Sequence, residues 1–172
     1  MIHLQHNISS DLAKYVHTIH YNKDYYPDHE MDKYLPDGTI NIIFELTNNP
    51  KFIFDNETHL KKQECKSAWF SGVLKDYITI SSSCEEMMVI VFKPGAGFPL
   101  VHKPASLFTN KVIQAEEIFG NSILRLLDEL IKPTEPETKF GEIEKWLKKQ
   151  LKEDDFYTDI IQKSIHEIVN TA

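Results

Sequence analysis

The chain has 172 residues and a mass of 20.0 kDa, which is the usual size of one domain with at most a small appendage. It carries 19 Lys and Arg against 26 Asp and Glu, a net charge of −7, and Arg125 is its single arginine. Because affinity for nucleic acids comes largely from Lys and Arg that neutralise phosphates, this composition argues against binding of DNA or RNA by the chain itself.

The sequence also argues against membranes and secretion. No apolar run approaches the roughly 20 residues that a membrane span requires, and residues 1–6 lack the basic and apolar regions of a signal peptide. The two cysteines, Cys65 and Cys84, are too few for a disulfide scaffold and have no metal-binding spacing. We therefore expect a cytoplasmic protein with no membrane partner.

Residues 12–92 show the short β-branched and aromatic runs that are typical of strands. The best is 39–46, where apolar and mostly polar residues alternate, which predicts a strand with one wet face. A proline and a glycine in 35–38 favour a turn before it. The segments 31–35 and 39–46 are therefore predicted to form a hairpin.

Further strands are predicted at 13–21, 51–54, 67–71 and 76–82, whereas the charged segment 55–66 is predicted to be a loop. The segment 87–92 is apolar on both alternating faces, so we expect a central strand that is covered on both sides and ends at Pro94. The total is about seven strands, mostly antiparallel because their connections are too short for crossover helices.

Past Pro104 the apolar residues follow the period of helices. One stripe runs from 118 to 131, with Gly120 as a break near its start. Thr134 and Glu137 form a candidate capping box for a second helix, and Asp154 or Asp155 is the candidate cap of a third.

The fold class is therefore α+β, a strand-rich antiparallel sandwich or half-barrel followed by two to three C-terminal helices. The expected parts are 1–132, a strand-rich domain with its first packing helix, then 133–153, a second helix of that domain, and 154–172, a terminal helix.

Few residues suggest catalysis or metal binding. His17 and His20 are three residues apart, which places them on opposite faces of the predicted strand. The glycine-rich segment 93–100 fails the dinucleotide template, because Leu100 stands in the place of the third glycine. The serines at 81–83 lack a nucleophile elbow. We therefore predict no enzyme activity, no metal and no cofactor.

Aromatic side chains are distributed over the predicted strands, where most of them would form the core. A small antiparallel body can also keep an apolar cavity that is lined by inward residues. The candidates for such a lining, chosen because aromatic faces suit ligand packing, are Tyr34, Phe44, Trp69 and Phe92.

Five segments carry a family resemblance: 34–38 (YLPDG), 70–73 (FSGV), 91–95 (VFKPG), 108–113 (FTNKVI) and 118–120 (IFG). In this order they resemble the N-terminal regulatory domain of bacterial AraC-type transcription regulators, over roughly residues 30 to 130. The chain departs from that pattern at Val73, Ala96 and 110–111. The matching positions of structural importance are Pro36, Asp37, Gly38, Gly72, Pro94 and Gly95.

The resemblance implies a cupin-like sensor fold that binds an unidentified small-molecule effector, oligomerises, or does both. The cupin metal motif is not found, so a metal-free pocket is expected. The family binds DNA through a C-terminal helix-turn-helix domain that this chain lacks, so we expect the sensing half of a longer regulator. A homodimer is also implied, with a candidate interface at Ile123, Leu127 and Leu130, although packing of these residues on the sheet is the simpler explanation.

The terminal helix at 156–169 is expected to dock on the domain or to pair with another copy. Two alternatives to a sensor remain at this point. One is a small cupin-like enzyme or carrier, which needs a polar cluster inside the cavity. The other is a stand-alone oligomerisation module, which needs no cavity.

Overall fold

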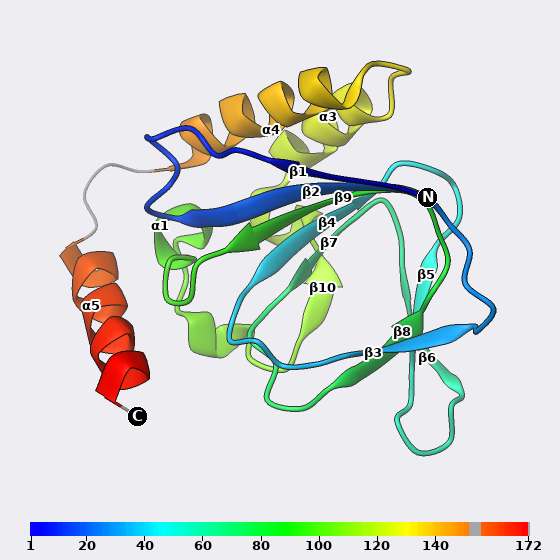
Figure 1. Cartoon of the computed structure of the whole chain (residues 1–172), viewed down its shortest axis with the longest axis horizontal. Coiled ribbons are helices and arrows are strands. Elements are labelled where there is room, and N and C mark those ends of the chain that lie inside the picture. Colours follow the sequence, from blue (N-terminus) through cyan, green and yellow to red (C-terminus); the bar gives the residue numbers. More distant parts are fainter. Residues whose placement is uncertain (152–155, 172) are drawn as a thin grey trace.

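The computed structural model describes residues 1–151 and 156–171, and it is an antiparallel sandwich with helices on one side (Figure 1). The larger sheet has six strands, in the order β1 (Ile2–His6), β2 (Val16–Tyr25), β9 (Cys84–Phe92), β4 (Asn41–Glu45), β7 (Ala68–Ser71) and β10 (Val112–Gln114). The smaller sheet has four, in the order β3 (Met31–Tyr34), β8 (Ile78–Ser81), β5 (Lys51–Phe54) and β6 (Lys61–Cys65). The predicted α+β class is confirmed.

The central strand of the larger sheet is β9, which pairs with β2 on one side and β4 on the other. Its residues alternate between two cores, because successive side chains of a strand point to opposite faces. Met88 and Ile90 belong to the core under the helices, whereas Met87 and Val89 pack in the core between the sheets. The prediction of a strand covered on both sides is confirmed.

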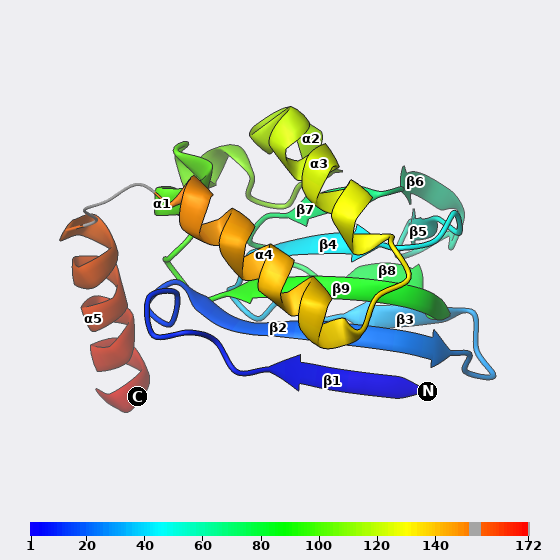
Figure 2. The ribbon, with the colours of Figure 1, turned by 90° about the horizontal axis from the view of Figure 1, so that it is seen from above.

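The outer face of the larger sheet is covered by α3 (Asn121–Leu130) and α4 (Pro136–Gln150), as Figure 2 shows. The short α2 (Glu116–Phe119) precedes α3, and the two are separated by Gly120 with φ +56°, which confirms the predicted break. The other helical segments are α1 (Phe98–Val101), a single 3₁₀ turn (Ala105–Leu107) and α5 (Phe156–Thr171).

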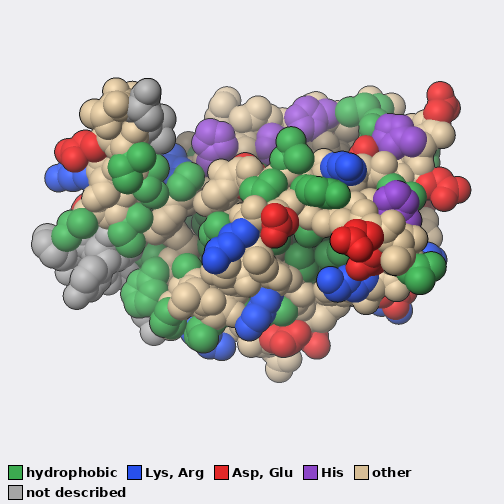
Figure 3. Space-filling view, turned by 90° about the horizontal axis from the view of Figure 1, so that it is seen from below, with side chains coloured by type: hydrophobic (Ala, Val, Ile, Leu, Met, Phe, Trp, Pro, Cys, Tyr) green, Lys and Arg blue, Asp and Glu red, His purple; other side chains and the backbone are tan. Residues whose placement is uncertain are grey.

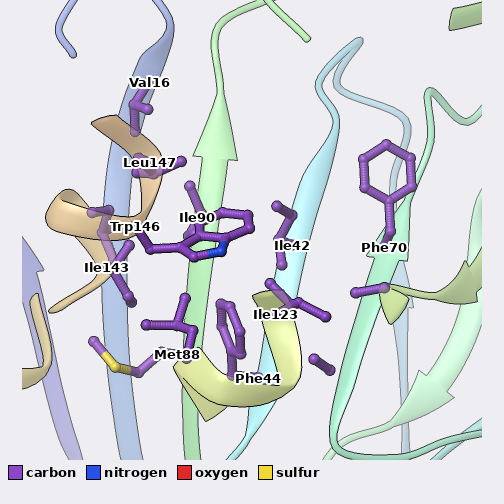
Figure 4. Packing of buried hydrophobic residues seen from close by; sticks show 14 of the residues in the cluster. Val16, Ile42, Phe44, Phe70, Met88, Ile90, Ile123, Ile143, Trp146 and Leu147 are labelled. Carbon is purple, nitrogen blue, oxygen red and sulfur yellow. The ribbon is translucent and has the colours of Figure 1, made fainter. Parts of the chain in front are cut away.

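The core under the helices is apolar and fully buried. In Figure 4, Ile143, Trp146 and Leu147 of α4 point toward the strands, and Ile123 of α3 lies beside them. From the sheet, the core receives fully buried side chains of β4, β7 and β9, namely Ile42, Phe44, Phe70, Met88, Ile90 and Phe92. This face carries the main apolar burial of the domain.

A buried lysine joins α3 to α4. Lys139 of α4 is 3% exposed, and its ammonium donates to the carbonyl oxygens of Leu130 and, at 2.8 Å, of Lys132. The last carbonyls of a helix have no partner inside it, so a side chain that donates to them caps its C-terminus. The same ammonium lies 3.7 Å from Glu86, which accepts a hydrogen bond from Tyr21 at 3.0 Å.

The strand pairing corrects the predicted hairpin of 31–35 with 39–46. β3 pairs with β8 in the smaller sheet, whereas β4 lies between β7 and β9 in the larger one. The face of β4 that was expected to be wet is also buried, because the smaller sheet covers it.

The structure has ten strands in its described residues rather than about seven. β6 lies within the segment predicted to be a loop, and β1 and β10 were not predicted. β2 begins and ends later than the predicted 13–21, and a register shift between Val16 and Thr18 interrupts its alternation. The argument that separated His17 from His20 by simple alternation therefore does not hold across this irregularity.

The predicted capping box is wrong. α4 begins at Pro136 with Glu135 as its N-cap, no side chain caps it, and the Thr134 hydroxyl donates instead to the carbonyl of Lys132 at 3.5 Å. Proline suits the first helical position because its missing N–H has no partner there anyway. The candidate caps Asp154 and Asp155 lie outside the described residues.

Candidate functional site

A cavity of about 340 Å³ lies between the two sheets. Its wall is formed by β4, β7 and β9 from the larger sheet and by β3, β5 and β8 from the smaller one. Figure 3 shows this side of the molecule, where hydrophobic side chains lie among Lys and acidic side chains. The lining is mostly apolar and includes Ile43, Ile78, Ile80, Met87 and Val89.

One end of the cavity is held by the turn before β4. The Tyr34 hydroxyl donates to Asp37 at 2.9 Å and accepts a hydrogen bond from the side-chain amide of Asn41 at 3.1 Å. Asp37 also accepts from the backbone N–H of Thr39 at 2.9 Å, and Gly38 takes φ +75°. The residues 36–38 thus place two cavity-lining side chains, Tyr34 and Asn41.

Two buried polar atoms of lining residues have no hydrogen-bond partner. They are the side-chain oxygen of Asn41, an acceptor, and Nε1 of Trp69, a donor. Both side chains are almost fully buried. Since buried polar atoms in folded proteins are nearly always hydrogen-bonded, these two atoms mark a polar part of the wall whose hydrogen-bonding capacity the fold itself does not use.

Lys51 is the buried cation of this site. It is 6% exposed, lines the cavity, and its ammonium donates to the carbonyl oxygens of Ser83 and, at 3.4 Å, of Ser81. Within the described part of the chain, no carboxylate oxygen lies within 4.0 Å of this ammonium. Its hydrogen bonds are therefore to neutral groups, and its charge is not neutralised by contact.

Glu45 lies on the same face of β4 as Asn41 and is also buried. Burial raises its pKa to about 7, and the charge of Lys51 opposes that shift only in part. One of its carboxyl oxygens, Oε1, has no partner. Glu45 does not itself line the cavity.

The two cysteines are free and buried. Burial raises the pKa of the Cys65 thiol to about 12 and that of Cys84 to about 11. Because the thiolate is the reactive form, neither thiol has the character of a nucleophile at neutral pH. Among residues 1–151 and 156–171, no group of three or more His, Cys, Asp and Glu is placed to hold a metal ion.

The structure divides the four aromatic candidates between two places. Tyr34 and Trp69 both line the cavity, Tyr34 from the smaller sheet and Trp69 from the larger one. Phe44 and Phe92 are fully buried on the opposite face of the larger sheet, under the helices, and do not line it. Asn41 and Lys51 also line the cavity and were not predicted to do so. The one sequence feature that could have indicated Asn41 is an amide within a strand of mostly apolar residues.

Two glycines of the resemblance, Gly72 and Gly95, occupy positions where a side chain would not fit. A Cβ at Gly72 would lie 1.9 Å from the carbonyl oxygen of Phe108. Gly95, which follows Pro94 at the exit of β9, has φ +76°, and a Cβ there would lie 2.3 Å from Ile161 of α5. These positions fix close approaches between separate segments.

The candidate dimer residues pack inside the chain. Ile123 and Leu130 are fully buried against the sheet, and Leu127 is partly buried beside them. Packing on the sheet, the simpler explanation, therefore accounts for this stripe.

The terminal helix α5 contacts the domain beside a second cavity of about 600 Å³, which Ile161 helps to line. The side-chain amide of Gln162 donates to the carbonyl of Lys14 at 2.8 Å, and the Lys14 ammonium lies 3.0 Å from Asp159. Together with the contact of Ile161 at Gly95, these interactions hold α5 against the body of the domain.

Residues 5–114 match the family described as "Domain of unknown function (DUF6597)". The chain belongs to this family. The matched residues include nearly all of the sandwich and the whole lining of the cavity except Met1. Comparison with curated proteins and with solved structures found no match. None of the described helices is long and apolar enough to cross a membrane.

Proposed function

We propose that this chain is the effector-sensing domain of an AraC-type transcription regulator and that its effector binds between the two sheets. The observation that carries the proposal is the cavity with the unpartnered atoms of Asn41 and Trp69. An apolar cavity with a few convergent polar groups is the usual form of a small-molecule site. In this proposal DNA is bound by a separate C-terminal domain, and the protein acts in the cytoplasm as a homodimer.

The sequence motifs support the same proposal, because they frame the two cavities. The turn at 36–38 positions Tyr34 and Asn41 in the first cavity. Gly95 receives α5 beside the second. In this proposal, the ligand between the sheets contacts one segment that carries the resemblance, and the terminal helix contacts another.

A small enzyme or carrier is the second candidate, and Glu45 is the observation that favours it. A buried carboxyl with a pKa of about 7 is suited to general acid–base catalysis at neutral pH. Because Glu45 does not line the cavity, sensing is the better supported of the two. Chromatography of the bound compound distinguishes them, since a sensor returns its ligand unchanged. An oligomerisation module alone would need no such cavity.

The proposal is tested by a thermal-shift screen of small metabolites, because a ligand that binds only the folded state raises the melting temperature. We expect some compounds to stabilise the chain. Trp69→Phe should weaken their binding roughly tenfold, because it removes one hydrogen-bond donor and keeps an aromatic ring. Trp146→Phe is the matched control, since Trp146 lies under the helices. Equal loss in both variants would count against a site between the sheets.

A further inference from the structure

The burial of Lys51 needs an explanation that the fold alone does not supply. Charged side chains are almost never this buried unless a counter-charge accompanies them, because removal of an ammonium from water is costly. Lys51 has carbonyl partners at Ser81 and Ser83 but no carboxylate in contact. A third N–H of the ammonium also remains for another acceptor.

The charged groups around the cavity leave Lys51 available. Glu45 is a buried carboxyl whose charge interacts with Lys51, but burial raises its pKa to about 7, so it is only partly ionised at neutral pH. Asp32, the one carboxylate among the described lining residues, is bound to His29 at 2.7 Å. Lys33 also lines the cavity, and its ammonium lies 4.7 Å from the ring centre of Tyr77. The balance of charge around the cavity therefore favours an anion.

The rest of the wall limits what kind of anion fits. Polar side chains such as Asn22, Ser71 and Ser82 also belong to the lining, but most of its surface is apolar and comes from residues such as Ile43, Met87 and Val89, which offer no hydrogen bonds. A sugar or a phosphate ester would bring more polar groups than this wall can satisfy, and unpaired polar groups are costly to bury. A molecule with one anionic group and an apolar body is the chemistry that matches.

From these observations we infer that the effector is a small monocarboxylate with an apolar body, whose carboxylate binds the ammonium of Lys51. This inference rests on the proposed function, since it assigns the ligand class of the same cavity. The ammonium keeps its two carbonyl partners and donates its third N–H to the carboxylate, while the apolar body packs between the sheets.

The test compares 3-phenylpropionate and hexanoate with their own carboxamides, which keep the shape and remove the charge. Isothermal titration of the whole chain should show each acid binding at least roughly tenfold more tightly than its amide, as hydrogen bonds to charged groups are stronger. Lys51→Met should abolish that preference, and Lys51→Arg should retain part of it. Lys62→Met, at an exposed position of β6 that does not line the cavity, is the matched control and should leave that preference unchanged.

Lys51→Met keeps the length of the stem and removes a buried charge, so it should fold; its circular dichroism and melting curve check this. If it does not fold, the acid-to-amide ratio of the unchanged chain still decides. Equal binding of acid and amide would overturn the inference that the effector is a carboxylate, and the chain would then be a sensor of neutral ligands. Failure of both probes while other compounds stabilise the chain would also overturn it. If no compound of any class binds, the proposed function itself fails.

Discussion

The two faces of the six-stranded sheet are built from the same strands and differ in nearly every other respect. Toward the helices, Ile42 and Phe44 of β4 are fully buried in an apolar core. Toward the smaller sheet, Asn41 and Ile43 of the same strand line a cavity, the side-chain oxygen of Asn41 has no partner, and Glu45 is a buried acid beside them. The alternation of a strand thus places stability on one face and the candidate site on the other.

Truncation of one residue on each face should give the largest difference in stability between the two faces. Phe44→Ala should lower the free energy of unfolding by about 3–5 kcal/mol, because it opens a hole in a core with no room to collapse. Ile43→Ala on the cavity side should cost about 2 kcal/mol, at the low end for such a change, because its side chain already borders empty space. Urea denaturation measures both, and equal costs would contradict the division of roles.

The buried acid gives the second test, through the pH dependence of stability. The pKa of Glu45 is raised by burial from 4.5 to about 7, so the folded state favours the protonated form. The stability that protonated Glu45 contributes is fully present below the pKa of Glu45 in the unfolded chain, and it is lost as the pH rises through about 7. The difference of roughly two and a half pKa units corresponds to about 3 kcal/mol. The charge of Lys51 opposes this shift of the Glu45 pKa, and the charge of Glu45 in turn helps to raise the pKa of the thiols of Cys65 and Cys84.

From pH 5 to pH 8, the free energy of unfolding should therefore fall in the unchanged chain and fall much less in Glu45→Gln. Glu57→Gln, at an exposed position, is the control and should follow the unchanged chain. If Glu45→Gln were as pH-dependent as the unchanged chain, Glu45 would not be the buried acid of the cavity side.

The sequence predicted those parts of the fold that depend on local periodicity. β5 has the predicted bounds, β9 is the predicted central strand, and Gly120 breaks the helix where expected. Strand neighbours could not be predicted in the same way, because a period of two gives the faces of a strand and not its partners. β6 was missed because its exposed, charged residues carry no apolar alternation.

The candidate site shows the same limit. Phe44 shares its parity with Ile40 and Ile42, so the alternation already placed it with the apolar face. The opposite face was expected to be wet, but a second sheet covers it and turns it into a cavity wall. Nothing local marks Lys51 as buried, since its carbonyl partners lie at the end of β8 and in the turn that follows it, about 30 residues away in sequence.

The smallest expected change in the free energy of unfolding is at Asn41. It tests whether the polar groups on the cavity face contribute to stability. The amide of Asn41 donates to Tyr34 and Thr39, but its oxygen is unpartnered and already costs desolvation. Asn41→Leu removes that cost along with the two bonds, so the free energy of unfolding should change by less than about 1 kcal/mol.

Thr79→Val is the control for a buried polar side chain that is satisfied, because the Thr79 hydroxyl donates to Asn56 at 2.9 Å. It should cost about 1–2 kcal/mol, more than Asn41→Leu, since it leaves the Asn56 oxygen with one partner fewer. A loss at Asn41 equal to that at Thr79 would mean that the amide is structural. With little loss of stability, the persistence of an unsatisfied polar atom in an apolar wall is explained by a ligand that hydrogen-bonds to it, and Asn41→Leu should then weaken binding while the fold is kept.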